Sequence, residues 1–211
     1  MKIVDNHVHT HFSSDAKDTM EDVIKRAIDI GVDCLTFTDH LEYNTDHFSL
    51  DIPKYTEQIS KYKEKYSDDI ELLTGIEVGY QSYLNKEINK ILNSTKFDFV
   101  LCSTHTIDKI PVPHREYFEG LSKEEAYRKY FESILQTNKE FKNYDIYGHL
   151  DYINRYAIYT LGSDSHRAID VCADFDKSYE MLDYLGFRYV SIFKNRKCEF
   201  IPIYQNIYHT A

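Results

Sequence analysis

Short apolar runs that end in histidine, aspartate or glutamate recur along this sequence, and they constrain its fold more than any other feature. The first run leads into His7 and His9, and the second ends in Thr38-Asp39-His40. Later runs end in Gly75-Ile76-Glu77, Ser103-Thr104-His105, Gly148-His149-Leu150-Asp151 and Gly162-Ser163-Asp164-Ser165-His166. Runs of this kind are typical of buried β-strands. In a parallel barrel the C-terminal ends of the strands surround one mouth, so these side chains are expected to meet there.

Helical periodicity alternates with the apolar runs. We expect strands over Lys2–Asn6, Cys34–Thr38, Leu72–Val78, Phe97–Ser103, Ile146–Gly148, Tyr159–Leu161 and Tyr189–Phe193. We expect helices over Thr19–Ile30, Ile52–Tyr66, Leu84–Leu92, Ser122–Phe141 and Asp176–Leu185, and a long loop over Thr106–Leu121. Alternating strands and helices indicate a parallel sheet, and residues 1–211 fit a single α/β domain. Ligand-type side chains at successive strand ends favour a barrel over an open sheet.

Charge and cysteine content narrow the class of protein. The formal net charge of −10 argues against nonspecific binding to nucleic acid or to an anionic membrane. No apolar stretch approaches the ~20 residues of a membrane span, and no signal peptide is recognisable. The four cysteines are widely spaced, which favours reduced thiols and a cytoplasmic location.

The His7-Val8-His9 pair shows why the polar strand ends predict a metal centre. Residues two apart on a strand point to the same side, so these imidazoles and Asp5 share one face. Asp164 and His166 repeat this spacing. Each of these residues alone could be an ordinary surface or structural side chain. Six strand ends that all carry such residues make a multinuclear metal hydrolase the better interpretation.

The ordered set of motifs resembles one known family. The segments DNHVHT, TDH, GIEVGY, STH, GHLD and GSDSH are similar to those of the PHP (polymerase and histidinol phosphatase) metalloesterases, from Met1 to about Pro202. The stretches His105–Pro111, Glu116–Glu119 and Ser122–Phe131 resemble the histidinol-phosphatase branch. The resemblance implies a distorted (βα)7-type TIM-like barrel around three divalent ions.

Carried over position by position, the resemblance implies a set of ligands for each ion. The first ion would be held by His7, His9, Glu77 and Asp164, and Glu77 would bridge to a second ion bound by His105 and His149. Asp15, His40 and His166 would hold the third ion. Nitrogen and oxygen ligands without thiolate suit Zn, Mn or Fe, and the sequence does not choose among them. Asp5, Asp39 and Asp151 are expected to orient the imidazoles.

The activity that the resemblance implies is hydrolysis of L-histidinol phosphate to L-histidinol and phosphate in histidine biosynthesis. A hydroxide that bridges the metals would attack phosphorus, with Glu77, Asp15 and Arg155 as catalytic residues. Arg155 would grip the phosphate, and His114 and Arg167 are further candidates for substrate binding. The general acid stays open between a metal-bound water and Asp15.

Two other functions remain open at this stage. One is a phosphoesterase that acts on a nucleotide or a phosphodiester, although the sequence shows no basic stripe with interleaved aromatic residues. The other is a metal-binding relic without activity. A small phosphate ester is the expected partner, with no nucleic acid and no membrane, and the chain is expected to be a monomer or a homodimer.

The resemblance breaks between residues 150 and 160. His149 and Asp164 are too close in sequence for the further βα unit that relatives carry in this interval, because a parallel crossover needs a dozen or more residues. We therefore expect a barrel with one βα unit missing. A deletion, a partner subunit that covers the gap, or a sequence that joins segments not contiguous in the native protein would each explain it.

Overall fold

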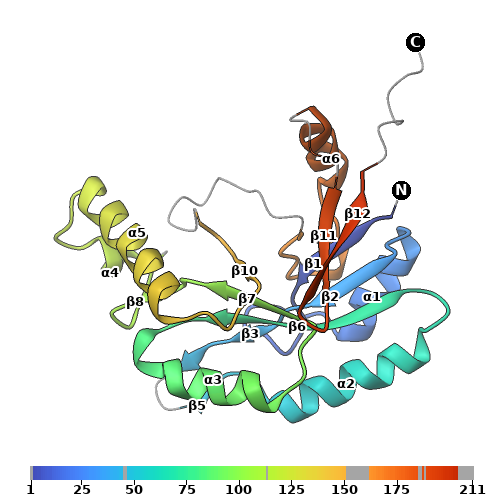
Figure 1. Cartoon of the computed structure of the whole chain (residues 1–211), viewed down its shortest axis with the longest axis horizontal. Coiled ribbons are helices and arrows are strands. Elements are labelled where there is room, and N and C mark those ends of the chain that lie inside the picture. Colours follow the sequence, from blue (N-terminus) through green and yellow to red (C-terminus); the bar gives the residue numbers. More distant parts are fainter. Residues whose placement is uncertain are drawn as a thin grey trace.

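A curled parallel sheet forms the centre of the computed structural model, which describes residues 2–44, 47–112, 114–150, 162–184, 187 and 189–203 (Figure 1). Its strands are β1 (Val4–Val8), β2 (Cys34–Phe37), β6 (Glu71–Gly79), β7 (Phe99–Ser103) and β10 (Ile146–Tyr147), side by side in that order. The short strand β3 (His40–Leu41) also pairs with β6. All these pairs are parallel, so the C-terminal ends of the strands lie at one edge.

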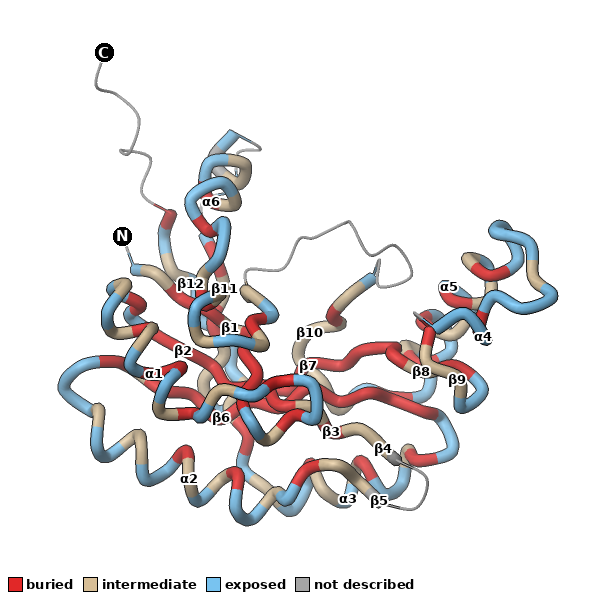
Figure 2. Tube along the Cα trace, turned by 180° about the vertical axis from the view of Figure 1, so that it is seen from behind, coloured by how far each residue is buried: buried red, intermediate tan, exposed pale blue. Residues whose placement is uncertain are grey.

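Helices pack against the sheet and bury its apolar side chains. The main core joins the strands to α1 (Met20–Asp29), α2 (Ile52–Lys65) and α3 (Asn85–Ser94), which follows the short helix η1 (Ser82–Leu84). A separate apolar cluster forms between α5 (Lys123–Glu140) and the segment before it. Figure 2 shows the consequence: the central strands are almost continuously buried, whereas the helices are buried along one side only.

Capping explains where the helices begin. Thr19 and Asp22 form a reciprocal capping box at the start of α1, and Ser122 and Glu125 form another at the start of α5. Asp51 accepts a hydrogen bond from the Lys54 backbone N–H at the start of α2. These caps satisfy N–H groups that have no partner inside the helix. The expected helices therefore begin within about one residue of the observed ones.

The expected loop over Thr106–Leu121 contains regular structure, which corrects the prediction. Strands β8 (Thr106–Ile107) and β9 (Ile110–Pro111) form a hairpin, and α4 (Arg115–Phe118) follows. A second small hairpin joins β4 (Tyr43–Asn44) to β5 (His47–Phe48).

The last expected strand is not part of the parallel sheet. Strand β11 (Tyr189–Lys194) pairs with β12 (Lys197–Pro202) in an antiparallel hairpin, which packs with α6 (Phe175–Tyr184). Asn195 and Arg196 both have positive φ, 48° and 62°. This is the backbone of a two-residue turn whose twist matches that of a hairpin.

The segment after Gly162 lies against the other edge of the sheet. Val8 and Ser165 form a parallel bridge, and the His9 N–H donates to the Ser165 carbonyl at 2.8 Å. Within the described residues the sheet thus runs from β10 to the Ser165 segment as a curled, open α/β layer. The expected strand Tyr159–Leu161 and the βα unit expected to be missing lie outside the described residues.

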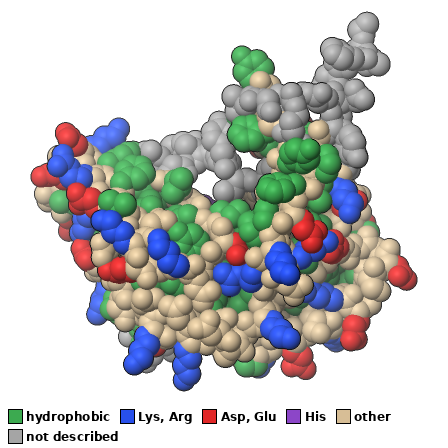
Figure 3. Space-filling view, viewed as in Figure 1, with side chains coloured by type: hydrophobic (Ala, Val, Ile, Leu, Met, Phe, Trp, Pro, Cys, Tyr) green, Lys and Arg blue, Asp and Glu red, His purple; other side chains and the backbone are tan. Residues whose placement is uncertain are grey.

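The surface mixes charge of both signs. On the face drawn in Figure 3, lysine and arginine side chains are interspersed with aspartate and glutamate, and hydrophobic side chains gather along its upper part. Phe131 and Leu135 on α5 are among the exposed large hydrophobic residues. Among the described helices, none has the length and apolarity needed to span a bilayer.

Candidate metal centre

Glu77 is the centre of a cluster of imidazoles and carboxylates at the C-terminal edge of the sheet. It lies on β6, the middle strand, and is fully buried. Its Oε1 lies 3.0 Å from His149 Nε2 and 3.2 Å from His105 Nε2. Its Oε2 lies 2.9 Å from His40 Nδ1 and 3.4 Å from His9 Nε2. One carboxylate thus contacts imidazoles from four different strand ends.

Asp164 supplies a second carboxylate beside the same imidazoles. Its Oδ1 lies 3.1 Å from His9 Nε2 and 3.2 Å from His7 Nε2. His7 Nε2 also lies 3.2 Å from His149 Nε2. His7 therefore lies between the Asp164 side and the Glu77 side of the cluster.

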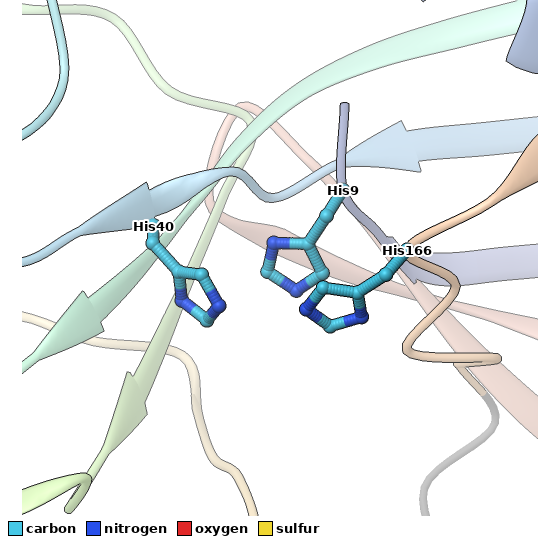
Figure 4. A group of neighbouring side chains, drawn as sticks. All are labelled: His9, His40 and His166. Atoms are coloured by element: carbon cyan, nitrogen blue, oxygen red, sulfur yellow. The ribbon is translucent and has the colours of Figure 1, made fainter. Parts of the chain in front are cut away.

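A third group forms where His9, His40 and His166 meet (Figure 4). The ring of His9 lies between the other two, with centroids 4.1 Å from that of His40 and 4.3 Å from that of His166. Asp15 lies beside this group: its Oδ2 is 3.4 Å from His40 Nε2 and 3.2 Å from His166 Nε2. The structure thus brings together all nine residues that the resemblance implies as ligands, and Asp15 is the most exposed of them, at 54% of its side chain.

The donor set fits divalent cations. Two ligands about 2.1 Å from one tetrahedral ion lie roughly 3.4 Å apart, close to the 3.0–3.4 Å separations of most of these nitrogen and oxygen atoms. His9 Nε2, His40 Nδ1 and Glu77 Oε2 are buried close to one another, yet none has a hydrogen bond of good geometry. Buried polar atoms are normally satisfied, so atoms that converge without hydrogen bonds indicate a cation site. Histidine and carboxylate ligands without thiolate suit Zn, Mn or Fe.

Electrostatics within the cluster is strongly coupled. Burial would raise the pKa of Glu77, but His105 and the other nearby imidazoles hold it well below its usual range. Burial opposes the protonation of His40 and His105, yet Glu77 raises the pKa of His40 to about 10 and that of His105 well above its usual value. Burial lowers the pKa of His9 to about 3. Without a cation, the negative charge of the carboxylates is thus balanced by protons on some of the imidazoles.

Acceptors behind the rings orient two of the imidazoles. His105 Nδ1 lies 2.6 Å from Glu42 Oε1, and His166 Nδ1 lies 2.8 Å from the Asp164 carbonyl oxygen. Each acceptor takes an Nδ1–H, so that when the imidazole is neutral its Nε2 directs a lone pair at the cluster. Sequence reasoning missed Glu42, which lies next to Leu41 of β3 and within reach of His40 and His105. No pattern in the sequence points to Glu42; in the structure its carboxylate lies over Gly79, where a Cβ would collide with it.

The expected orienting role of two other aspartates takes a different form. Asp5 is fully buried and accepts hydrogen bonds from the backbone N–H groups of Ser163 at 2.8 Å and Cys172 at 3.1 Å. It thus holds the segment that carries Asp164 rather than an imidazole. Gly162 lies directly against this strand, because a Cβ at Gly162 would meet the backbone and side chain of His7. Asp39 accepts from Thr10 and Ser13, and Asp151 lies outside the described residues.

The residues expected to bind substrate lie apart from the cluster or outside the described residues. Arg167 pairs with Asp170 through two hydrogen bonds of 2.7 and 3.0 Å, and 68% of its side chain is exposed. His114 is exposed and precedes α4. Arg155 lies outside the described residues. A role for these three residues in substrate binding stays a prediction.

Comparison with known proteins places this site in a family. The chain is 36% identical over 163 residues to the histidinol-phosphatase of Lactococcus lactis, an alignment that covers 76% of this chain and 61% of the relative. It is 28% identical to a Clostridium acetobutylicum protein named "Probable histidinol-phosphatase", across 96% of this chain and 80% of that protein. The chain therefore spans less than two thirds of the length of the Lactococcus relative.

A solved structure matches the same architecture. The histidinol phosphate phosphatase of Lactococcus lactis, complexed with zinc, L-histidinol and phosphate, superposes with a TM-score of 0.85 and 26% identity, across 94% of this chain and 99% of that one. The sequence profile of the PHP domain matches residues 5–196. This chain therefore belongs to the PHP family.

Proposed function

We propose that this protein is a metal-dependent phosphomonoesterase that hydrolyses L-histidinol phosphate to L-histidinol and phosphate. The observation that carries the proposal is one cluster of nine nitrogen- and oxygen-bearing side chains that includes Glu77 and Asp164, in a chain similar to an enzyme whose structure contains zinc, L-histidinol and phosphate. That this chain forms a complete substrate pocket is part of the proposal, because the alignment covers 61% of the length of the Lactococcus relative.

Three divalent ions account for the grouping of the side chains. His7, His9 and Asp164 would hold the first, and Glu77 would bridge it to a second ion on His105 and His149. Asp15, His40 and His166 would hold the third. Zinc is the first choice because the Lactococcus structure contains it, and manganese or iron suits the same ligands. When bound, such ions neutralise charge on the phosphoryl oxygens and lower the pKa of bound water.

The protein's own groups would hold this arrangement rigid. Ser103 Oγ donates to Glu77 Oε1 at 2.6 Å, which fixes the orientation of the bridging carboxylate. Glu42 and the Asp164 carbonyl hold the His105 and His166 rings. A site fixed before the substrate arrives does not have to reorganise as charge develops on the phosphoryl group.

Asp15 is better suited to bind a cation than to donate a proton. Partial burial would raise its pKa, but His166 and His40 lower that pKa well below the usual value. A carboxyl group that stays ionised at neutral pH is a ligand and a poor general acid. We therefore propose that water, and not Asp15, donates the proton to the leaving group.

The proposal also covers the cellular compartment, the residues that bind the substrate and the complete fold. The four cysteines are free thiols, which fits a reducing compartment such as the cytoplasm and a role in amino-acid biosynthesis. Arg155 is the proposed phosphate clamp, with His114 and Arg167 as secondary candidates. A closed (βα)7-type barrel, in which another segment or subunit completes the curled sheet, is the proposed complete fold, as a monomer or homodimer.

The test is phosphate release from L-histidinol phosphate by zinc- or manganese-loaded protein. We expect turnover in the wild type and a loss of about 100-fold or more in Glu77→Gln and His149→Ala, because each removes a group that positions transition-state charge. The matched control is His11→Ala, since His11 lies two residues after His9 but is exposed and packs on Phe12.

Other outcomes would replace the proposal. Hydrolysis of a diester or nucleotide without release of phosphate from L-histidinol phosphate would indicate a different PHP activity. Bound metal without turnover of any phosphoester would indicate a relic. Equal loss of activity in His11→Ala and His149→Ala would contradict the assigned site.

A further inference from the structure

The Ser13 hydroxyl lies at the junction of three groups behind the metal cluster. Its Oγ is 2.7 Å from Asp39 Oδ1, 3.0 Å from the His40 backbone N and 3.1 Å from His9 Nδ1. Ser13 is buried, with 2% of its surface exposed. A serine hydroxyl has one proton to donate and two lone pairs that accept. With three close partners, each of these positions is used.

Asp39 takes the hydroxyl proton. Asp39 Oδ1 also accepts from the Thr10 backbone N–H at 2.7 Å, and Oδ2 is 2.9 Å from Thr10 Oγ1. An ionised carboxylate can only accept hydrogen bonds. If Asp39 were neutral, its proton would have an acceptor in Thr10 Oγ1, on the oxygen that does not face Ser13. Either way the Ser13 O–H points to Asp39 Oδ1.

The two lone pairs of Ser13 then face donors. A backbone N–H can only donate, so His40 takes one lone pair. The other lone pair faces His9 Nδ1, and a hydrogen bond forms there only if Nδ1 carries a proton. Neutral imidazole has one N–H, so the proton on Nδ1 leaves His9 Nε2 as a bare lone pair.

The position of His9 Nε2 agrees with this assignment. The atom is buried and makes no hydrogen bond of good geometry, although Asp164 Oδ1 and Glu77 Oε2 lie 3.1 and 3.4 Å away. An Nε2–H directed at two carboxylates would form a strong hydrogen bond. A lone pair there instead suits a cation that lies between the ring and the carboxylates.

We propose that Ser13, oriented by Asp39, is a positioning residue that fixes His9 as the Nδ1–H tautomer and so keeps Nε2 ready to bind a metal ion. This inference deepens the proposed function and rests on its metal centre, but it does not depend on the substrate. Loss of the hydroxyl removes the acceptor at Nδ1. The proton is then more stable on Nε2, where Asp164 accepts it and competes with the metal.

The first test is a long-range proton–nitrogen NMR spectrum of the metal-free wild type, with the His9 ring assigned through correlations to its backbone. We expect the signature of a protonated Nδ1 and an unprotonated Nε2. A His9 ring protonated on Nε2 would overturn the proposal. This measurement needs neither a variant nor turnover, so it is independent of the test of the phosphatase activity.

The second test compares Ser13→Ala with Ser14→Ala by competition for Zn²⁺ with a chromophoric chelator. Ser14 is the exposed neighbour and provides the same chemical change outside the network. We expect zinc affinity to fall about 10- to 100-fold in Ser13→Ala, the usual cost of losing a group that orients a ligand, and to stay unchanged in Ser14→Ala. In Ser13→Ala the NMR signature should also move to Nε2–H. Equal affinities in the two variants would overturn the proposal, and if Ser13→Ala does not fold, the wild-type spectrum decides.

Discussion

Glu77 places a buried negative charge where several imidazoles can share it. This arrangement raises the pKa of His40 to about 10 and that of His105 well above its usual value. When no cation is present, Glu77 therefore favours the protonated form of both rings. A ring nitrogen binds a metal only after it has lost its proton, so metal ions and protons compete for these sites.

Zinc binding should therefore release protons. When metal-free protein is titrated with Zn²⁺ near pH 7, we expect at least about one proton to be released per site that contains His40 or His105. Since both pKa values are raised, apparent zinc affinity should increase as the pH rises from 6 toward 9. Calorimetry in buffers of different ionisation enthalpy measures the release. A zinc affinity that does not change over this range would contradict the assigned protonation, and His11→Ala should behave as the wild type.

Residue types and their spacing indicated most of this centre but not its supporting groups. Glu77 and His105 end recognisable apolar runs, so a strand prediction also predicts where they point. Ser13 and Glu42 lie in short irregular segments, where no periodicity fixes the direction of a side chain. Their partners became visible only once the loops were placed in space.

Among the elements, β1, β2, β6, β7 and β10 were predicted to within about two residues, whereas the short parallel strand β3 and the antiparallel pairing of β11 with β12 were not predicted. Strand β6 was expected over Leu72–Val78 and spans Glu71–Gly79. A strand that is buried on both faces is apolar on both faces, so its position can be recognised in the sequence. Strand β11 has apolar content similar to that of a parallel strand. Strand β11 differs from a parallel strand in that the Asn195-Arg196 turn joins it to an antiparallel partner, β12. The residues of β12 are mostly exposed, so its sequence carries little apolar signal.

Asp98 joins that hairpin to the sheet. Its carboxylate accepts hydrogen bonds from the Thr74 and Asn195 backbone N–H groups, both at 3.0 Å, and forms an ion pair with Lys63 at 3.0 Å. Partial burial would raise the pKa of Asp98, but these three partners lower it overall. One carboxylate therefore ties together β6, α2 and the β11–β12 turn.

Asp98→Asn should lower the free energy of unfolding by about 1.5–3 kcal/mol near pH 7, the range for hydrogen bonds to a charged group. The folded pKa lies below the unfolded value of about 3.9, so the contribution is present above pH 4 and is lost as the pH falls through the folded value. Urea unfolding of both proteins at pH 7 and pH 3 measures this. The difference should shrink at pH 3, and exposed Asp69→Asn should show little effect at either pH.

At the scale of the whole molecule, the proposed ions would act as cross-links between distant parts of the chain. The ligand side chains come from strand ends that stretch from His7 to His166. Removal of metal would leave their carboxylates and imidazoles balanced only by protons. Metal binding to the folded state alone would therefore stabilise the whole fold.

Chelation should lower the melting temperature. At free zinc about 1,000-fold above Kd, one site stabilises the fold by about 4 kcal/mol. For a chain of this size that corresponds to roughly 10 °C. Differential scanning calorimetry with EDTA, and then with excess Zn²⁺, measures the loss and its recovery. A melting temperature that does not respond to EDTA would argue against tightly bound metal, and Glu77→Gln should respond much less than the wild type.

The described residues on either side of the interval 151–161 are each held in place beside the ligand cluster. Before it, Tyr130 donates a hydrogen bond to the His149 carbonyl at 2.5 Å; after it, the Ser163 N–H donates to Asp5 at 2.8 Å. Neither anchor uses a residue inside the interval. His149 and Asp164 are therefore each fixed from their own side of the interval, one through α5 and the other through β1.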